Sequence, residues 1–134
     1  MIKNEQKILG IDYGMRKIGL SVAEGVLAEP IGTLIMNEND DIFIKIKQII
    51  NKEKINKIII GISEGNMAIK TKIFSKKLAE IINIPVIIWD ETLSSAESRK
   101  KMAEMGKLKK DRNLKEHSIA ATLILQDYLD NKIQ

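Results

Sequence analysis

Short β-branched runs and helically spaced apolar positions alternate along this chain. Three strand-like runs come first, at about residues 7–13, 18–24 and 28–35, and they are separated by Gly14 and Gly25. Strands this close together in sequence, with glycine between them, are typical of hairpins. The first 35 residues therefore predict an antiparallel meander.

The remaining chain alternates helices with strands. The runs at 57–62 and 85–89 are continuously apolar, which is typical of strands buried on both faces. Helical spacing predicts helices at about 41–53 and 68–82, at 94–106 behind a Ser94/Glu97 capping box, and last around Ala120, Ala121, Ile124 and Tyr128. The prediction is one α/β domain over residues 1–134. Its five-stranded mixed sheet, with a meander followed by parallel βαβ units, has the element order of a ribonuclease H-like fold.

Composition removes several functional classes. The chain has 134 residues and no cysteine, which excludes disulfides and thiolate metal sites. The N-terminus lacks the apolar stretch of a signal peptide, and no later run approaches the length of a membrane span. We therefore expect a soluble, cytoplasmic protein with no membrane partner.

The formal net charge of +4 is concentrated in one segment. Residues 99–115 hold eight basic and two acidic side chains, and Lys109, Lys110 and Arg112 lie at the centre of that tract. A basic tract can hold a polyanion whose phosphates are repelled by acidic residues elsewhere. The alternative is a solvated lysine-rich face without a nucleic-acid partner.

Two acidic positions follow predicted strands. Asp12 ends the first strand, and the pair Asp90-Glu91 ends the strand at 85–89. Carboxyl ends of neighbouring parallel strands meet at one edge of a sheet, where their carboxylates can bind Mg²⁺ or Mn²⁺ for phosphodiester hydrolysis. Alternatively, Asp12 forms a turn before Tyr-Gly, and the Asp-Glu pair caps the following helix.

Four segments, at 10–23, 60–62, 90–96 and 120–129, resemble in order the YqgF/RuvX family. This family comprises Holliday junction resolvases and nucleases of precursor 16S rRNA. The resemblance covers nearly the whole chain. It implies a ribonuclease H-like fold, a divalent metal cofactor and maturation of the 5′ end of precursor small-subunit rRNA.

The resemblance assigns metal-binding and catalytic roles to three residues. Asp12 matches the family's first-strand aspartate, and Glu91 matches the glutamate of its Asp-Glu-Arg motif. His117 occupies the position of the third acid, an aspartate that opens the last helix. Imidazole suits Mn²⁺ better than Mg²⁺, so this departure predicts a shift in metal preference. Related resolvases of the RuvC type use histidine there. The alternative is a helix-start histidine that faces solvent.

Further candidates concern substrate binding. Arg16 and Lys17 follow Asp12 in the hairpin and could reach a scissile phosphate, or stand in solvent. Asn66 and Ser94 are candidate phosphate donors, with a turn residue and a helix cap as alternatives. Aromatic residues are few and none are grouped on a surface strand, so a base-stacking platform is not predicted.

The leading hypothesis is a metal-dependent endonuclease acting on structured nucleic acid, most simply the 5′ end of pre-16S rRNA in a pre-ribosomal particle. Asp12 and Glu91 would hold Mn²⁺ or Mg²⁺, and His117 would complete the site or activate water. The alternatives are a Holliday junction resolvase and a catalytically inactive nucleic-acid or ribosome-binding module. An actin-like phosphotransferase is disfavoured because it needs two such domains. Both a monomer and a homodimer are compatible with the sequence.

Overall fold

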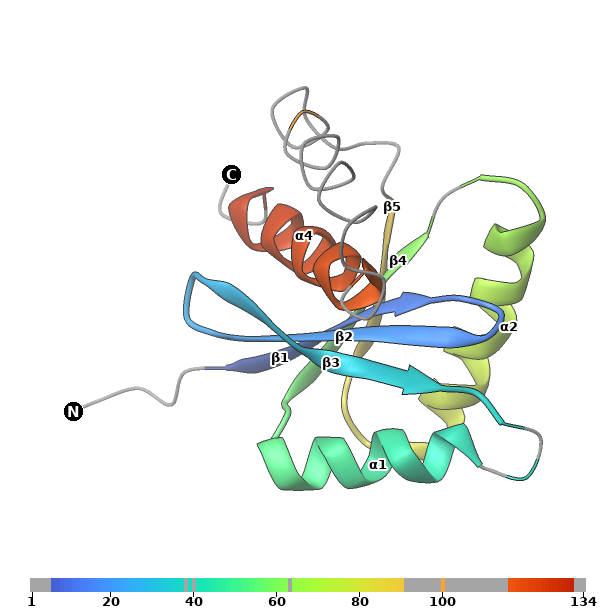
Figure 1. Cartoon of the computed structure of the whole chain (residues 1–134). Helices are drawn as coiled ribbons and strands as arrows, with labels where there is room; N and C mark the ends of the chain where they lie inside the picture. Colours follow the sequence, from blue (N-terminus) through green and yellow to red (C-terminus); the bar gives the residue numbers. More distant parts are fainter. Residues whose placement is uncertain are drawn as a thin grey trace.

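The computed structural model describes residues 6–37, 39, 41–62, 64–90, 100 and 116–131. Within them a five-stranded sheet runs in the order β3-β2-β1-β4-β5, with helices on both faces (Figure 1). The strands are β1 (Lys7–Tyr13), β2 (Lys17–Glu24), β3 (Ala28–Ile35), β4 (Lys57–Ile62) and β5 (Val86–Asp90). The helices are α1 (Ile42–Glu53), α2 (Asn66–Ile81) and α4 (Glu116–Asn131).

The sheet is mixed, as the sequence predicts. β1 is antiparallel to β2, and β2 is antiparallel to β3, so the first three strands form a meander. On its other side β1 is parallel to β4, which is in turn parallel to β5. The first strand is therefore central. The carboxyl ends of β1, β4 and β5 lie at the same edge of the sheet.

The sheet has an apolar core on each face. Figure 1 shows α4 crossing one face and α1 lying against the other. Leu9 and Ile11 of β1 join the core under α1 and α2, whereas Ile8 joins the core under α4. β4 behaves in the same way, because Ile58 and Ile60 face the first core and Ile59 the second, all of them fully buried. Burying such a side chain stabilises the fold by roughly 1.5–3 kcal/mol. The two-sided burial predicted for the strand at 57–62 is confirmed.

Small residues let α4 approach the sheet closely. A Cβ at Gly10 of β1 would lie 2.8 Å from the Cβ of Leu125, and one at Gly61 of β4 would meet the side chain of Ile124. Between them in the chain, Ser21 of β2 donates a 2.8 Å hydrogen bond from Oγ to the carbonyl oxygen of Ala121 in the helix. Glycine inside a strand often marks such a close approach. This packing positions α4 over β1 and β2.

The predicted element boundaries are close to those observed. Asp41 caps α1, since its side chain accepts a 2.9 Å hydrogen bond from the amide of Phe43. α2 begins two residues earlier than predicted, because Gly65, at φ 85°, lets the chain turn into the helix immediately after the loop. The helix predicted at 94–106 lies outside the described residues. In the part of the chain that the structure describes, no helix is long and apolar enough to cross a membrane.

Candidate functional site

Asp12 and His117 meet at the carboxyl end of β1. Asp12 is the penultimate residue of that strand, and His117 lies in the first turn of α4. The Nδ1 atom of His117 is 3.3 Å from Oδ2 of Asp12. The two side chains keep 34% and 25% of their surface exposed, so the pair is reachable from solvent. The structure thus brings together two of the three residues predicted to form the site.

Two glycines leave room for the histidine. A Cβ at Gly19 of β2, which is paired with Asp12 across the strands, would overlap the backbone carbonyl group of His117. A Cβ at Gly14 would lie 3.4 Å from Cε1 of the imidazole and 2.7 Å from the carbonyl oxygen of Lys17. Gly14 also separates two predicted strands, and both glycines lie in the 10–23 segment that resembles the family, but neither was predicted to have a packing role. A glycine inside a strand was the available signal for a close backbone approach.

The end of β5 lies at the same edge of the sheet as the end of β1. Trp89 packs in the core under α4, and Asp90, the last residue of the strand, is half-buried. The convergence of Asp90 with Asp12 stays a prediction. Glu91 lies outside the described residues, and its role as the partner of Asp12 stays a prediction.

The Asp12/His117 pair has a donor set suited to a divalent metal ion. A carboxylate oxygen and an imidazole nitrogen are both ligands for Mn²⁺, and neighbouring ligands of an octahedral ion at about 2.1 Å lie about 3 Å apart. The observed 3.3 Å between the two donor atoms fits that spacing. No cluster of three potential metal ligands occurs among the described residues. The pair could hold part of a metal site, and a complete site would need a further ligand.

Predicted substrate-binding residues surround this end of the sheet. Arg16 is exposed in the β1–β2 hairpin, and its carbonyl oxygen accepts a 2.8 Å hydrogen bond from the amide of Met36. Lys17 is half-buried at the start of β2, and Asn66 is exposed as the first residue of α2. The remaining predicted residues lie outside the described part: Ser94, Lys109, Lys110 and Arg112. Substrate contact by all of these residues stays a prediction.

A polar contact that was not predicted holds α4 against β5. Trp89 belongs to the run at 85–89 that was predicted to be a buried strand, and it donates a 2.7 Å hydrogen bond from Nε1 to Oδ2 of Asp127. Asp127 is only 6% exposed and also accepts from the side chain of Asn131, at 3.1 Å. Tyr128, the next residue in the chain, packs edge-on against Trp89, with the two ring centroids 5.4 Å apart. An acid within an otherwise apolar helix stripe is the signal that could have indicated this contact.

A five-stranded mixed sheet in the order β3-β2-β1-β4-β5, with a meander on one side, parallel strands on the other and helices on both faces, is the arrangement of ribonuclease H-like proteins. Solved structures support this fold. The RuvC protein of Thermus thermophilus in complex with a Holliday junction superposes with a TM-score of 0.58, at 13% identity over 96% of both chains. The fowlpox virus resolvase in complex with Holliday junction DNA superposes with a TM-score of 0.58, at 14% identity. The match covers 96% of this chain and 100% of the viral chain.

The chain belongs to the RuvX family, whose model is described as "Holliday junction resolvase" and matches residues 6–131. Two relatives are named "Putative pre-16S rRNA nuclease". The one from Thermoanaerobacter pseudethanolicus is 32% identical, covering 94% of this chain and 97% of its own length. The relative from Syntrophus aciditrophicus is 34% identical, and the match covers 92% of this chain and 88% of the relative. The resemblance seen in the sequence is confirmed, and the protein is a member of a nuclease family, in the class of phosphodiester hydrolases.

Proposed function

We propose that this protein is a metal-dependent endonuclease that processes the 5′ end of precursor 16S rRNA. The observation that supports it most directly is the 3.3 Å contact between Asp12 Oδ2 and His117 Nδ1 at the carboxyl end of the central strand. The relatives named for this activity match nearly the whole chain. The proposal includes a single ribonuclease H-like domain that acts in the cytoplasm, where bacterial rRNA precursors are processed.

Asp12 and His117 would hold the ion, with Glu91 as the third ligand. A divalent cation, when bound, neutralises phosphate charge and lowers the pKa of water, so that hydroxide forms near neutral pH. The neutral imidazole is the form that can offer a lone pair from Nδ1.

The pair also supports a second role for the histidine. When Nδ1 carries the proton, it donates to Oδ2 of Asp12, and this orients the ring and leaves Nε2 as a proton acceptor. Nε2 could then take a proton from the attacking water during in-line displacement at phosphorus. In this second role Asp12 holds the imidazole at the strand end. Arg16 and Lys17, next in the hairpin, would hold the phosphate backbone.

The test compares wild type with Asp12→Asn on two substrates, a structured RNA that contains the precursor 5′ cleavage site and a four-way DNA junction. With Mn²⁺ or Mg²⁺ we expect wild type to cleave the RNA, and the variant to be slower by about 100-fold or more, as for loss of a metal-site carboxylate. Glu24→Gln is the matched control, because Glu24 is exposed at the opposite end of the β1–β2 pair. A variant at position 12 that cleaves as fast as wild type would exclude the proposed site.

The description of the family model favours Holliday junction resolution as the second candidate. Symmetric cleavage of a four-way junction requires two active sites, so this candidate also predicts a homodimer, whereas the RNA role is compatible with a monomer. Cleavage of the junction but not of the RNA would select it. Binding of RNA without any metal-dependent cleavage would select the catalytically inactive binding module. That alternative is considered because His117 occupies the position of the family's third acid.

A further inference from the structure

Three of the five aromatic residues of the chain gather under the β1–β2 hairpin, on the face of the sheet opposite α4. Tyr13 stacks on Phe74 with ring centroids 4.4 Å apart, and Phe43 stacks on the same ring at 5.5 Å. The interplanar angles are 22° and 23°, so the Tyr13 and Phe43 rings are each stacked on the Phe74 ring with a small tilt. This aromatic group was not predicted, because its residues come from β1, α1 and α2 and are far apart in the chain.

The rings line a cavity of about 200 Å³. Its other walls are Met36, Ile42, Lys70, Ile73 and Lys77. Phe74 is buried, but Tyr13 and Phe43 are only half-buried, and Ile73 keeps 52% of its surface exposed. The cavity is thus an apolar, aromatic pocket that solvent can enter. A planar ring system is the chemical group that fits such walls.

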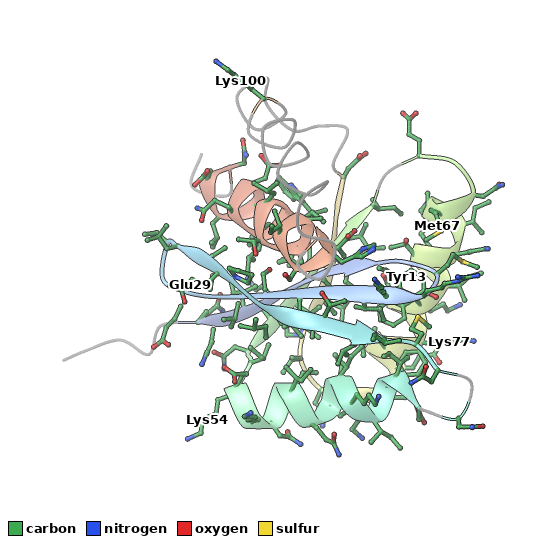
Figure 2. The ribbon with its side chains drawn as sticks, in the orientation of Figure 1. Tyr13, Glu29, Lys54, Met67, Lys77 and Lys100 are labelled. Atoms are coloured by element: carbon green, nitrogen blue, oxygen red, sulfur yellow. The ribbon has the colours of Figure 1, made fainter. Side chains whose placement is uncertain are left out.

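Positive charge borders this pocket. Lys70 and Lys77 belong to its lining, both are exposed, and no acidic residue is among the described lining residues. Figure 2 shows Tyr13 and Lys77 on the same side of the molecule. α2 as a whole carries four lysines and one glutamate. Lysines beside stacked rings match a ligand that joins an aromatic base to a phosphate.

The pocket lies next to the candidate site along the chain. Tyr13 directly follows Asp12, and alternation along β1 turns the two side chains to opposite faces at the same strand end. The tip of the β1–β2 hairpin also contacts the rim of the pocket, because Lys70 Nζ lies 3.2 Å from the sulfur of exposed Met15. A strand held by its phosphate at Asp12 could therefore pass over the hairpin and reach the pocket with a neighbouring nucleotide.

From these contacts we infer that the pocket of Tyr13, Phe43, Phe74 and Ile73 binds one nucleobase of the substrate strand, and that Lys70 and Lys77 bind the adjacent phosphates. This inference rests on the proposed function, because it takes nucleic acid as the substrate. It adds a recognition element that the phosphate contacts lack: the strand must present an unpaired base close to the cleaved bond. Stacking accepts any base and does not require a defined sequence.

The experiment measures binding of single-stranded RNA oligonucleotides in which each nucleotide in turn is abasic, in the Asp12→Asn background to avoid cleavage. We expect one abasic position to weaken binding roughly tenfold, the scale of a stacked base. Phe43→Leu and Tyr13→Leu keep apolar volume but remove a ring, so each should lower the affinity for the intact strand and abolish the abasic effect. Thermal melting verifies that the variants are folded.

Charge variants test the rim of the pocket. Lys70→Glu and Lys77→Glu should weaken binding of the intact strand, whereas Lys72→Glu and Lys76→Glu are matched controls on the same helix that do not line the pocket. If all four variants lose the same affinity, the loss reflects the net charge of the helix, and the assignment of the phosphate contacts to Lys70 and Lys77 is overturned.

The outcomes separate this inference from the proposed function. If the protein cleaves RNA but no abasic position matters, or if Phe43→Leu keeps the abasic effect, the pocket assignment is wrong and the nuclease stands. If free AMP or UMP binds in the pocket and the abasic effect is absent, the pocket serves a mononucleotide and the inference is overturned. If no oligonucleotide binds while wild type cleaves the structured RNA, the pocket assignment falls and the nuclease stands. If wild type also fails to cleave, both proposals fall.

Discussion

Gly19 of β2 lies directly beneath the backbone of His117, so closely that a single methyl group at position 19 would overlap the carbonyl group of the histidine. This contact sets how near the first turn of α4 can come to the end of β1. Asp12, which is paired with Gly19 across the strands, then meets the imidazole at 3.3 Å. The candidate site therefore depends on the absence of a side chain as much as on the two that form it.

Gly19→Ala should displace the start of α4 and destabilise the protein by about 1–3 kcal/mol, as overpacking does in a well-packed core. Gly61→Ala is the matched comparison under the same helix. There the new methyl would meet the side chain of Ile124, whose end can rotate away, so the cost should be smaller. Urea unfolding of both variants measures the difference in unfolding free energy. Equal costs would contradict the rigid backbone contact proposed for Gly19.

His117→Asp should shift the metal preference of the nuclease from Mn²⁺ toward Mg²⁺, by roughly tenfold in the ratio of the two metal affinities. The reason is that a carboxylate oxygen replaces a nitrogen donor, and Mg²⁺ prefers oxygen. Calorimetric titration of both ions into wild type and variant measures the ratio. His117→Asn is the control, since it removes the imidazole without adding charge. An unchanged ratio would mean that this side chain does not bind the ion.

Trp89→Phe should destabilise the protein by about 1.5–3 kcal/mol, because it removes the donor to a buried carboxylate while keeping an aromatic ring in the core. Asp127→Asn in the same background should restore part of that loss, since the amide carries no charge to leave unsatisfied. A double-mutant cycle built from unfolding free energies tests this coupling. Strictly additive costs would show that the 2.7 Å contact contributes no net coupling.

Gln126 joins α4 to the β2–β3 hairpin through both ends of its amide. Its Oε1 accepts from the amide of Ala28 at 2.9 Å, and its Nε2 donates to the carbonyl oxygen of Val26 at 2.9 Å. Gln126→Ala should therefore speed hydrogen exchange at the Ala28 amide by about tenfold, the scale of one hydrogen bond. Gln126→Glu keeps an acceptor and should leave that amide protected. Equal exchange in all three proteins would exclude the contact in solution.

Most of the fold was predictable because its signals are local. The runs at 7–13, 28–35 and 57–62 have the same bounds in the structure, since β-branched residues and flanking turn residues determine a strand within a few positions. Two-sided burial of β4 followed from its unbroken apolar run. The helix at 42–53 followed from isoleucine spacing and an aspartate cap.

The contacts that build the site and the pocket were less accessible to sequence reasoning. Trp89 was correctly predicted to be a core residue, but its buried acidic partner was not, because the two lie 38 positions apart. The aromatic group was missed for the same reason. Tyr13, Phe43 and Phe74 look unrelated in the sequence and become neighbours only when α1 and α2 pack on one face of the sheet.

The sequence by itself determined the strands, three of the helices, the mixed sheet and the family, because periodicity and motif order are properties of short segments. It also indicated Asp12 and His117 as site residues. The tertiary structure alone decided that these two, 105 positions apart, lie 3.3 Å from each other. The physical reason is packing. The depth at which α4 settles on the sheet is set by small residues on other strands, and no local pattern contains that distance.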